Sequence, residues 1–125
     1  MPEFLLKSET YRILGAAFEV YNELGPGFLE AVYQECMQIE LRRIGVAFAP
    51  GARLRIRYKG ELIEKQYVCD LICFDAVIVE LKALTRLSSL DVSQLLNYLK
   101  ASGHRVGLLL NFGAPAGLEW KRLVR

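Results

Sequence analysis

Apolar residues recur at helical spacing in two segments near the start of the sequence. The first segment ends at Gly25, and the second begins after Gly27 and ends at Gly45. Apolar side chains three and four residues apart share one side of an α-helix, and glycine commonly follows the last turn. The first set is Ile13, Leu14, Ala17, Phe18, Tyr21 and Leu24, and the second is Leu29, Tyr33, Cys36, Met37, Leu41 and Ile44. The pattern predicts two helices.

The period of the pattern then changes to two. Within residues 53–58, apolar side chains alternate with arginines, and a Lys-Gly pair follows as a turn. Residues 67–74 and 77–82 are mostly apolar and are separated only by Asp75 and Ala76. Alternation is typical of half-buried strands, and short apolar runs are typical of central ones. We therefore predict three antiparallel strands.

The last part of the sequence has the pattern of a helix followed by a strand. Residues 90–102 carry an apolar helical stripe that ends before Gly103, and residues 106–112 form a short apolar run. A helix between two strands provides the crossover that a parallel pair requires. The predicted class is α/β or α+β, with residues 1–125 as a single domain.

Composition narrows the functional classes. A hydrophobic fraction of 53% excludes intrinsic disorder, and a net charge of +2 gives no strong overall attraction to nucleic acid. No apolar segment is long enough to cross a membrane. The three cysteines, in a sequence without the pattern of a secretory leader, favour reduced thiols in the cytoplasm. Cys69 and Cys73, roughly 13 Å apart along one strand, are too distant to share one metal ion.

Two acidic residues interrupt the predicted central strands. Glu80 and Lys82 are two residues apart, so their side chains leave the same face of a strand with Cα atoms roughly 6.6 Å apart. If the preceding strand runs antiparallel, Asp70 lies across the ladder from Glu80. A carboxylate in an apolar strand is costly unless it is paired or binds a cation.

This set of side chains has two interpretations. Two carboxylates supply the hard oxygen ligands of Mg²⁺, which assists phosphodiester hydrolysis, and Lys82 would orient water or stabilise negative charge. Alternatively, Lys82 neutralises Asp70 and Glu80 in a buried ion-pair cluster. The spacing alone leaves both open.

A second pattern, Gly27-Phe28-Leu29-Glu30-Ala31-Val32-Tyr33, matches that of the GxxExxY protein family. This family resembles the PD-(D/E)XK nuclease superfamily. The likeness runs from about Ile13 to the C-terminus. It includes Glu23-Leu24-Gly25-Pro26-Gly27, Tyr58-Lys59-Gly60, Asp70, Val79-Glu80-Leu81-Lys82-Ala83, Gln94-Leu95-Leu96-Asn97-Tyr98-Leu99 and Gly107-Leu108-Leu109-Leu110-Asn111-Phe112-Gly113.

The resemblance implies a restriction-endonuclease-like α/β core with a small mixed central sheet flanked by helices. It makes Asp70 and Glu80 the metal-binding acids and Lys82 the catalytic lysine. It adds Glu30, from a helix, and Gln94, from the helix after the strands, to the catalytic set. Mg²⁺ or Mn²⁺ is the implied cofactor.

Several residues keep a second interpretation. Asp91 stands where relatives often have a histidine, although Asp91, Gln94 and Tyr98 share one helical face that would look into the site. Glu30 would also suit the first turn of a helix for electrostatic reasons alone. Tyr33 fits either the core or a substrate contact. His104, the only histidine, follows a helix stop and is expected at the surface.

The clearest basic stripe consists of Arg53, Arg55, Arg57 and Lys59. It would either track a phosphate backbone or protect a solvated strand edge from pairing. The sequence thus predicts a metal-dependent nuclease acting on DNA or RNA, in a homodimer or larger assembly if it does not act alone. The alternative is a nucleic-acid- or protein-binding module on the same fold with little or no turnover.

Overall fold

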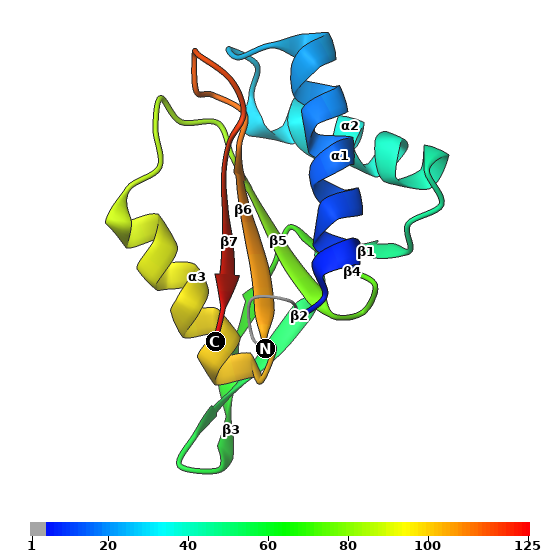
Figure 1. Ribbon diagram of the computed structural model, residues 1–125. Helices are drawn as coiled ribbons and strands as arrows, with labels where there is room; N and C mark the ends of the chain where they lie inside the picture. Colours follow the sequence, from blue (N-terminus) through cyan, green and yellow to red (C-terminus); the bar gives the residue numbers. More distant parts are fainter. Residues whose placement is uncertain (1–4) are drawn as a thin grey trace.

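A five-stranded mixed sheet forms the centre of the protein, for which a computed structural model describes residues 5–125 (Figure 1). Strands β5 and β6 are parallel, and the other neighbouring pairs are antiparallel. In spatial order the strands are β1 (Phe48–Pro50), β4 (Leu71–Cys73), β5 (Val77–Lys82), β6 (Val106–Asn111) and β7 (Glu119–Val124).

Helices cover both faces of the sheet. Helices α1 (Lys7–Leu24) and α2 (Glu30–Arg43) pack on one face, and α3 (Ser89–Ser102) packs on the other (Figure 1). Each face has its own buried apolar cluster, because successive side chains of a strand point in opposite directions. The three predicted helices, the parallel crossover through α3 and the α/β class with a small mixed sheet are confirmed.

The prediction of one central strand over residues 67–74 is wrong. The chain leaves a two-stranded ribbon, formed by β2 (Arg53–Tyr58) and β3 (Glu61–Val68), and enters the main sheet as β4. At the break, the Cys69 N–H donates to the Ala52 carbonyl and the Asp70 carbonyl accepts from the Gly51 N–H. Both sheets bury apolar residues, so apart from Asp70 the apolar run continues across the change of partner.

The predicted set of three antiparallel strands is therefore corrected. Only β4 and β5 pair as expected, joined by a short turn in which Phe74 and Asp75 have positive φ. Strand β2 pairs with β3 outside the main sheet, while β1 and β7, which the sequence pattern did not predict, form the two edges of the sheet. The turn after β4 fixes the register that brings Asp70 to Glu80.

Candidate active site

Asp70 and Glu80 hold each other in place at the ends of paired strands. Leu71 lies opposite Val79, so the next pair outward along the ladder is Asp70 and Glu80. The Asp70 N–H donates to Glu80 Oε1 at 3.0 Å, and the Leu81 N–H donates to Asp70 Oδ2 at 2.8 Å. Each carboxylate thus takes a hydrogen bond from the backbone of the opposite segment.

Lys82 joins the two acids on the α3 side of the sheet. Val79 and Leu81 lie in the cluster beneath α1 and α2, while Ile78 lies in the cluster beneath α3. By strand alternation Glu80 and Lys82 share the face of Ile78. Both line a cavity of about 60 Å³, whose walls are Tyr67, Glu80, Lys82, Asp91, Gln94, Leu95, Tyr98 and Leu109.

Burial shifts both carboxyl groups toward the protonated form, and at Glu80 the charge of Asp70 adds to this shift. Burial, followed by the charge of Asp70, raises the pKa of Glu80 to about 7, against the effects of Lys82 and two hydrogen bonds. Burial also raises the pKa of Asp70, opposed by the Leu81 N–H and by Lys82. One lysine beside two half-buried acids leaves the site short of positive charge.

Two tyrosines complete the site: Tyr98, which the helical spacing predicted to face it, and Tyr67, which the sequence analysis did not single out. The ring of Tyr67 stacks on Tyr98 with centroids 3.4 Å apart and planes 7° apart. The Tyr67 side chain is hydrogen-bonded to Glu80, and burial, followed by the charge of Glu80, raises the pKa of Tyr67. Tyr67 fell within an apolar run, so no local signal marked it, whereas the spacing of three and four residues from Asp91 and Gln94 placed Tyr98 on the correct face of the helix.

Glu30 lies at the margin of this group. Its side chain is exposed at the start of α2 and is not among the residues that line the cavity. Partial desolvation raises the pKa of Glu30, Asp70 raises it further and Lys82 lowers it. The Gln34 side chain, one turn later on α2, donates to the Asp70 carbonyl at 3.4 Å. The first turns of α2 are thus tied to Asp70, and a catalytic role for Glu30 stays a prediction.

Tyr33 belongs to the core, which decides between the two interpretations of this residue. Its ring is fully buried and stacks on Phe112, with ring centroids 4.8 Å apart. Its hydroxyl donates to the Gly25 carbonyl at 2.6 Å and accepts from the Phe28 N–H at 3.2 Å. Gly27 between them has φ of 109°, a conformation that favours glycine. Gly27 and Tyr33 together shape the loop that leads to Glu30 at the start of α2.

Gln94 and Asp91 face the cavity from α3, as the helical spacing predicted. The Gln94 side chain donates to the Tyr98 hydroxyl at 3.2 Å. Asp91 has a second function that the sequence analysis missed: its carboxylate accepts from the Ser88 N–H, and Ser88 Oγ accepts from the Asp91 N–H. This reciprocal pair caps α3, and the signal was the acid three residues after Ser88.

The basic stripe lies on the ribbon and does not line the cavity. Arg53, Arg55 and Arg57 are exposed along β2, and Lys59 follows in the turn to β3 with its ammonium 5.6 Å from the centre of the Tyr58 ring. The cysteines are free, with Cys69 and Cys73 buried in clusters on opposite faces of the sheet. His104 lies just beyond α3 beside Ser102, as expected for a helix-end residue.

Comparison with known protein families accounts for this arrangement. The profile of the PD-(D/E)XK nuclease superfamily matches residues 7–123, which is nearly the whole chain. The chain belongs to this superfamily. Its five-stranded mixed sheet flanked by helices is consistent with the restriction-endonuclease-like fold. Comparison with curated proteins and with solved structures gave no match.

The PD-(D/E)XK superfamily typically uses divalent metal ions, and the donors present suit such an ion in part. No group of three or more His, Cys, Asp or Glu side chains within residues 5–125 could hold a metal by itself. Asp70 and Glu80 supply two carboxylates, and Mg²⁺ is commonly held by one or two carboxylates while water and phosphate oxygens fill the other positions. The donor set fits Mg²⁺ with substrate and does not fit a closed protein cage.

None of the helices in the described part of the chain could cross a membrane. Among residues 5–125, no helix combines the length and the apolar character that a membrane span requires.

Proposed function

We propose that this member of the PD-(D/E)XK superfamily is a Mg²⁺- or Mn²⁺-dependent nuclease that hydrolyses phosphodiester bonds in DNA or RNA. Within the superfamily, the Gly27-to-Tyr33 pattern supports membership of the GxxExxY group as part of this proposal. The observation that carries the proposal is the paired geometry of Asp70 and Glu80, which accept hydrogen bonds from each other's strands beside Lys82.

In this proposal, Asp70 and Glu80 hold the divalent ion. When bound, such an ion polarises the scissile phosphate and lowers the pKa of water. The backbone hydrogen bonds at Asp70 Oδ2 and Glu80 Oε1 fix both side chains before any ligand arrives, so less conformational entropy is lost on binding. Burial raises the pKa of both acids, and the charge of Asp70 raises that of Glu80 further; a bound cation would stabilise both ionised carboxylates.

Lys82 supports the reaction from the same face of β5. Its Nζ donates hydrogen bonds to an anionic phosphate oxygen or to the attacking water, and it stabilises negative charge as that charge develops. Gln94 adds a neutral donor from α3. Glu30 adds an acid from α2 whose charge already interacts with Asp70 and Lys82. These roles follow from the family resemblance together with the positions of the side chains.

A specific observation favours the second candidate, a binding module with little or no turnover. The cavity beside Glu80 and Lys82 measures only about 60 Å³, and the stacked Tyr67 and Tyr98 form part of its wall. Asp91 is engaged in capping α3. Turnover requires the tyrosine pair to admit a phosphate, whereas a binding module does not.

Asp70→Asn tests the proposal. The amide keeps an oxygen acceptor for the Leu81 N–H but removes one of two repelling charges, so the stability of the metal-free protein should be unchanged or higher. We expect Mg²⁺ to raise the melting temperature of the parent by mass action and to have little effect on the variant. Cleavage of single- and double-stranded DNA and RNA should be lost in the variant.

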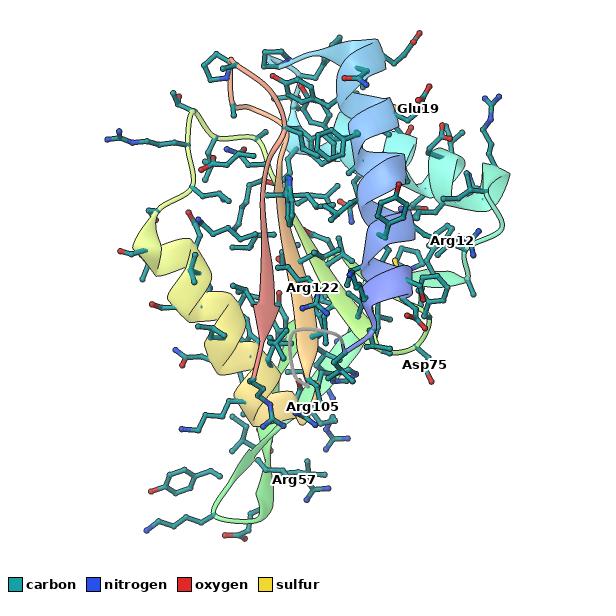
Figure 2. All side chains as sticks on the ribbon, viewed as in Figure 1. Arg12, Glu19, Arg57, Asp75, Arg105 and Arg122 are labelled. Carbon is teal, nitrogen blue, oxygen red and sulfur yellow. The ribbon has the colours of Figure 1, made fainter. Side chains whose placement is uncertain are left out.

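Asp75→Asn is the matched control, because Asp75 lies in the exposed turn after β4 (Figure 2) and asparagine tolerates its positive φ. It should keep both the Mg²⁺ response and the cleavage. If Asp70 instead serves only as a partner of Lys82, Asp70→Asn should cost roughly 3–5 kcal/mol in chelator. That loss, together with a parent that does not respond to Mg²⁺, would exclude the metal site.

A further inference from the structure

A basic groove of about 740 Å³ lies between the ribbon and the C-terminal turn of α3. Its walls include Arg53, Arg55 and Arg57 from β2 together with Lys100 and His104 from the end of α3, and no acidic side chain lines it. The ribbon extends past the last turn of α3 (Figure 1), and Figure 2 shows Arg57 there, away from the main sheet. The sequence marked the arginines as a stripe, but the α3 wall arises only from the fold.

The cations of this groove are not neutralised by the protein. Within residues 5–125, no hydrogen bond or ion pair engages the side chains of Arg53, Arg55 or Lys100. Arg57 donates only to the Gly60 carbonyl at 3.3 Å. The negative end of the α3 dipole offsets part of the Lys100 charge, but it does not account for three arginines on a strand. Unpaired like charges facing one groove indicate an anionic ligand.

The groove and the carboxylate site lie along the same helix. Gln94 and Tyr98 face the cavity, while Asn97 and Lys100 line the groove from the neighbouring stripe of α3, and His104 lines it from just beyond the helix. Gln94 and Lys100, one from each set, are six residues apart, which is roughly 9 Å along the helix axis. A flexible polyanion that occupies the groove therefore reaches Glu80 and Lys82 within a short length of chain.

Aromatic rings stand at the boundary between groove and site. Tyr67 and Tyr98 line the cavity, while Leu54, the ladder partner of Tyr67, and Ala101, one turn after Tyr98, line the groove. Both rings are only half-buried. A positive groove that leads to aromatic side chains is the combination that binds single strands, because each unpaired base offers a face for stacking.

From this juxtaposition we infer that the substrate is single-stranded nucleic acid. Its backbone lies along the groove, and its bases reach the Tyr67 and Tyr98 pair next to the carboxylates. The inference rests on the proposed function, since it names the substrate class of that site. A duplex keeps its base faces stacked internally, so it offers the tyrosines nothing to stack on.

Binding of labelled oligonucleotides, followed by fluorescence anisotropy in chelator, tests this inference without cleavage. The probes are oligothymidylate, oligouridylate and a blunt DNA duplex of the same length. We expect the single strands to bind about tenfold tighter than the duplex. The Tyr98→Leu variant should lose much of this preference, because leucine keeps apolar bulk without an aromatic face.

The groove is tested by Arg55→Gln combined with Lys100→Gln, two exposed side chains whose loss should not disturb folding. We expect about a tenfold loss of affinity for single strands and a salt slope shallower by about 1.4, from two cations at 0.7 each. Arg43→Gln combined with Lys121→Gln removes two exposed cations outside the groove and should leave affinity unchanged.

Equal or tighter binding of the duplex would overturn the inference, as would parental affinity in the groove variant. The result is independent of the metal site. A protein that binds single strands through the groove but shows no Mg²⁺ response keeps this inference and loses the proposed nuclease activity. A protein that responds to Mg²⁺ but does not use the groove for binding keeps the proposed nuclease activity and loses this inference.

Discussion

Asp70 and Glu80 face each other across a strand pair, and their burial, together with the charge of Asp70 beside Glu80, makes the stability of the protein depend on pH. Burial and Asp70 raise the pKa of Glu80 from an ordinary value of 4.5 to about 7. A carboxyl group with a higher pKa in the folded state binds more protons when folded. Its contribution to stability is therefore complete below about pH 4.5 and is lost as the pH rises through about 7. Asp70 has a shift of the same sign.

We expect the metal-free protein to lose about 1–3 kcal/mol of unfolding free energy between about pH 5 and pH 8 from this source. Urea unfolding in chelator measures it. Glu80→Gln should flatten the profile over this range, whereas Glu64→Gln, an exposed change on β3, should not. A parent protein that becomes more stable toward pH 8 would show that Lys82 outweighs the repulsion between the acids.

At the scale of elements, the segment between β5 and α3 is held by the side chains of Asn111 and Glu119. Asn111 is fully buried opposite Lys82 on β6. Its amide accepts from the Leu84 N–H and donates to the Leu84 carbonyl and to Glu119 Oε1, all within 2.9 Å. Glu119 also accepts from the Leu87 N–H, just before α3. These hydrogen bonds position the chain directly after Lys82.

Asn111→Ala should therefore cost about 2–4 kcal/mol, because it leaves several buried polar groups without partners. We expect thermal and urea unfolding to show this loss. Asn97→Ala, an exposed change on α3, should be neutral or slightly stabilising, since alanine favours helix. A near-neutral Asn111→Ala would mean that other contacts hold the segment between β5 and α3.

Across the whole molecule, the sheet separates a structural face from the face that carries the site. Leu108 and Leu109 are consecutive on β6 and almost completely buried, with exposed fractions of 0% and 1%. Leu108 packs beneath α1 and α2, whereas Leu109 packs beneath α3 and lines the cavity beside Glu80. Replacing each leucine by alanine therefore makes the same chemical change on opposite faces of the sheet.

We expect Leu108→Ala and Leu109→Ala each to destabilise the protein by about 2–5 kcal/mol. Only Leu109→Ala should alter the Mg²⁺-induced rise in melting temperature and the cleavage rate, because it enlarges the cavity next to Glu80 and Lys82. Differential scanning fluorimetry compares the Mg²⁺ responses, and a cleavage assay run below the melting range of both variants compares the rates. Equal functional losses would mean that the two faces are not independent.

The sequence by itself determined those features that depend on neighbouring positions in the chain. The apolar spacing located the three helices, and the period of two placed Glu80 and Lys82 on one face, since backbone geometry fixes both periods. The short connection after Cys73 predicted the antiparallel pair that brings Asp70 to Glu80. Each of these inferences spans only a few residues.

Only the tertiary structure decided which distant segments meet. The apolar run over residues 67–74 did not show that it divides between two sheets, because strands of either sheet can carry apolar side chains. That division carries Tyr67 to Glu80 and to Tyr98, and it sets the ribbon beside Lys100 to form the basic groove. These contacts join residues 13 to 47 positions apart, so they depend on packing and sheet registry rather than on local pattern.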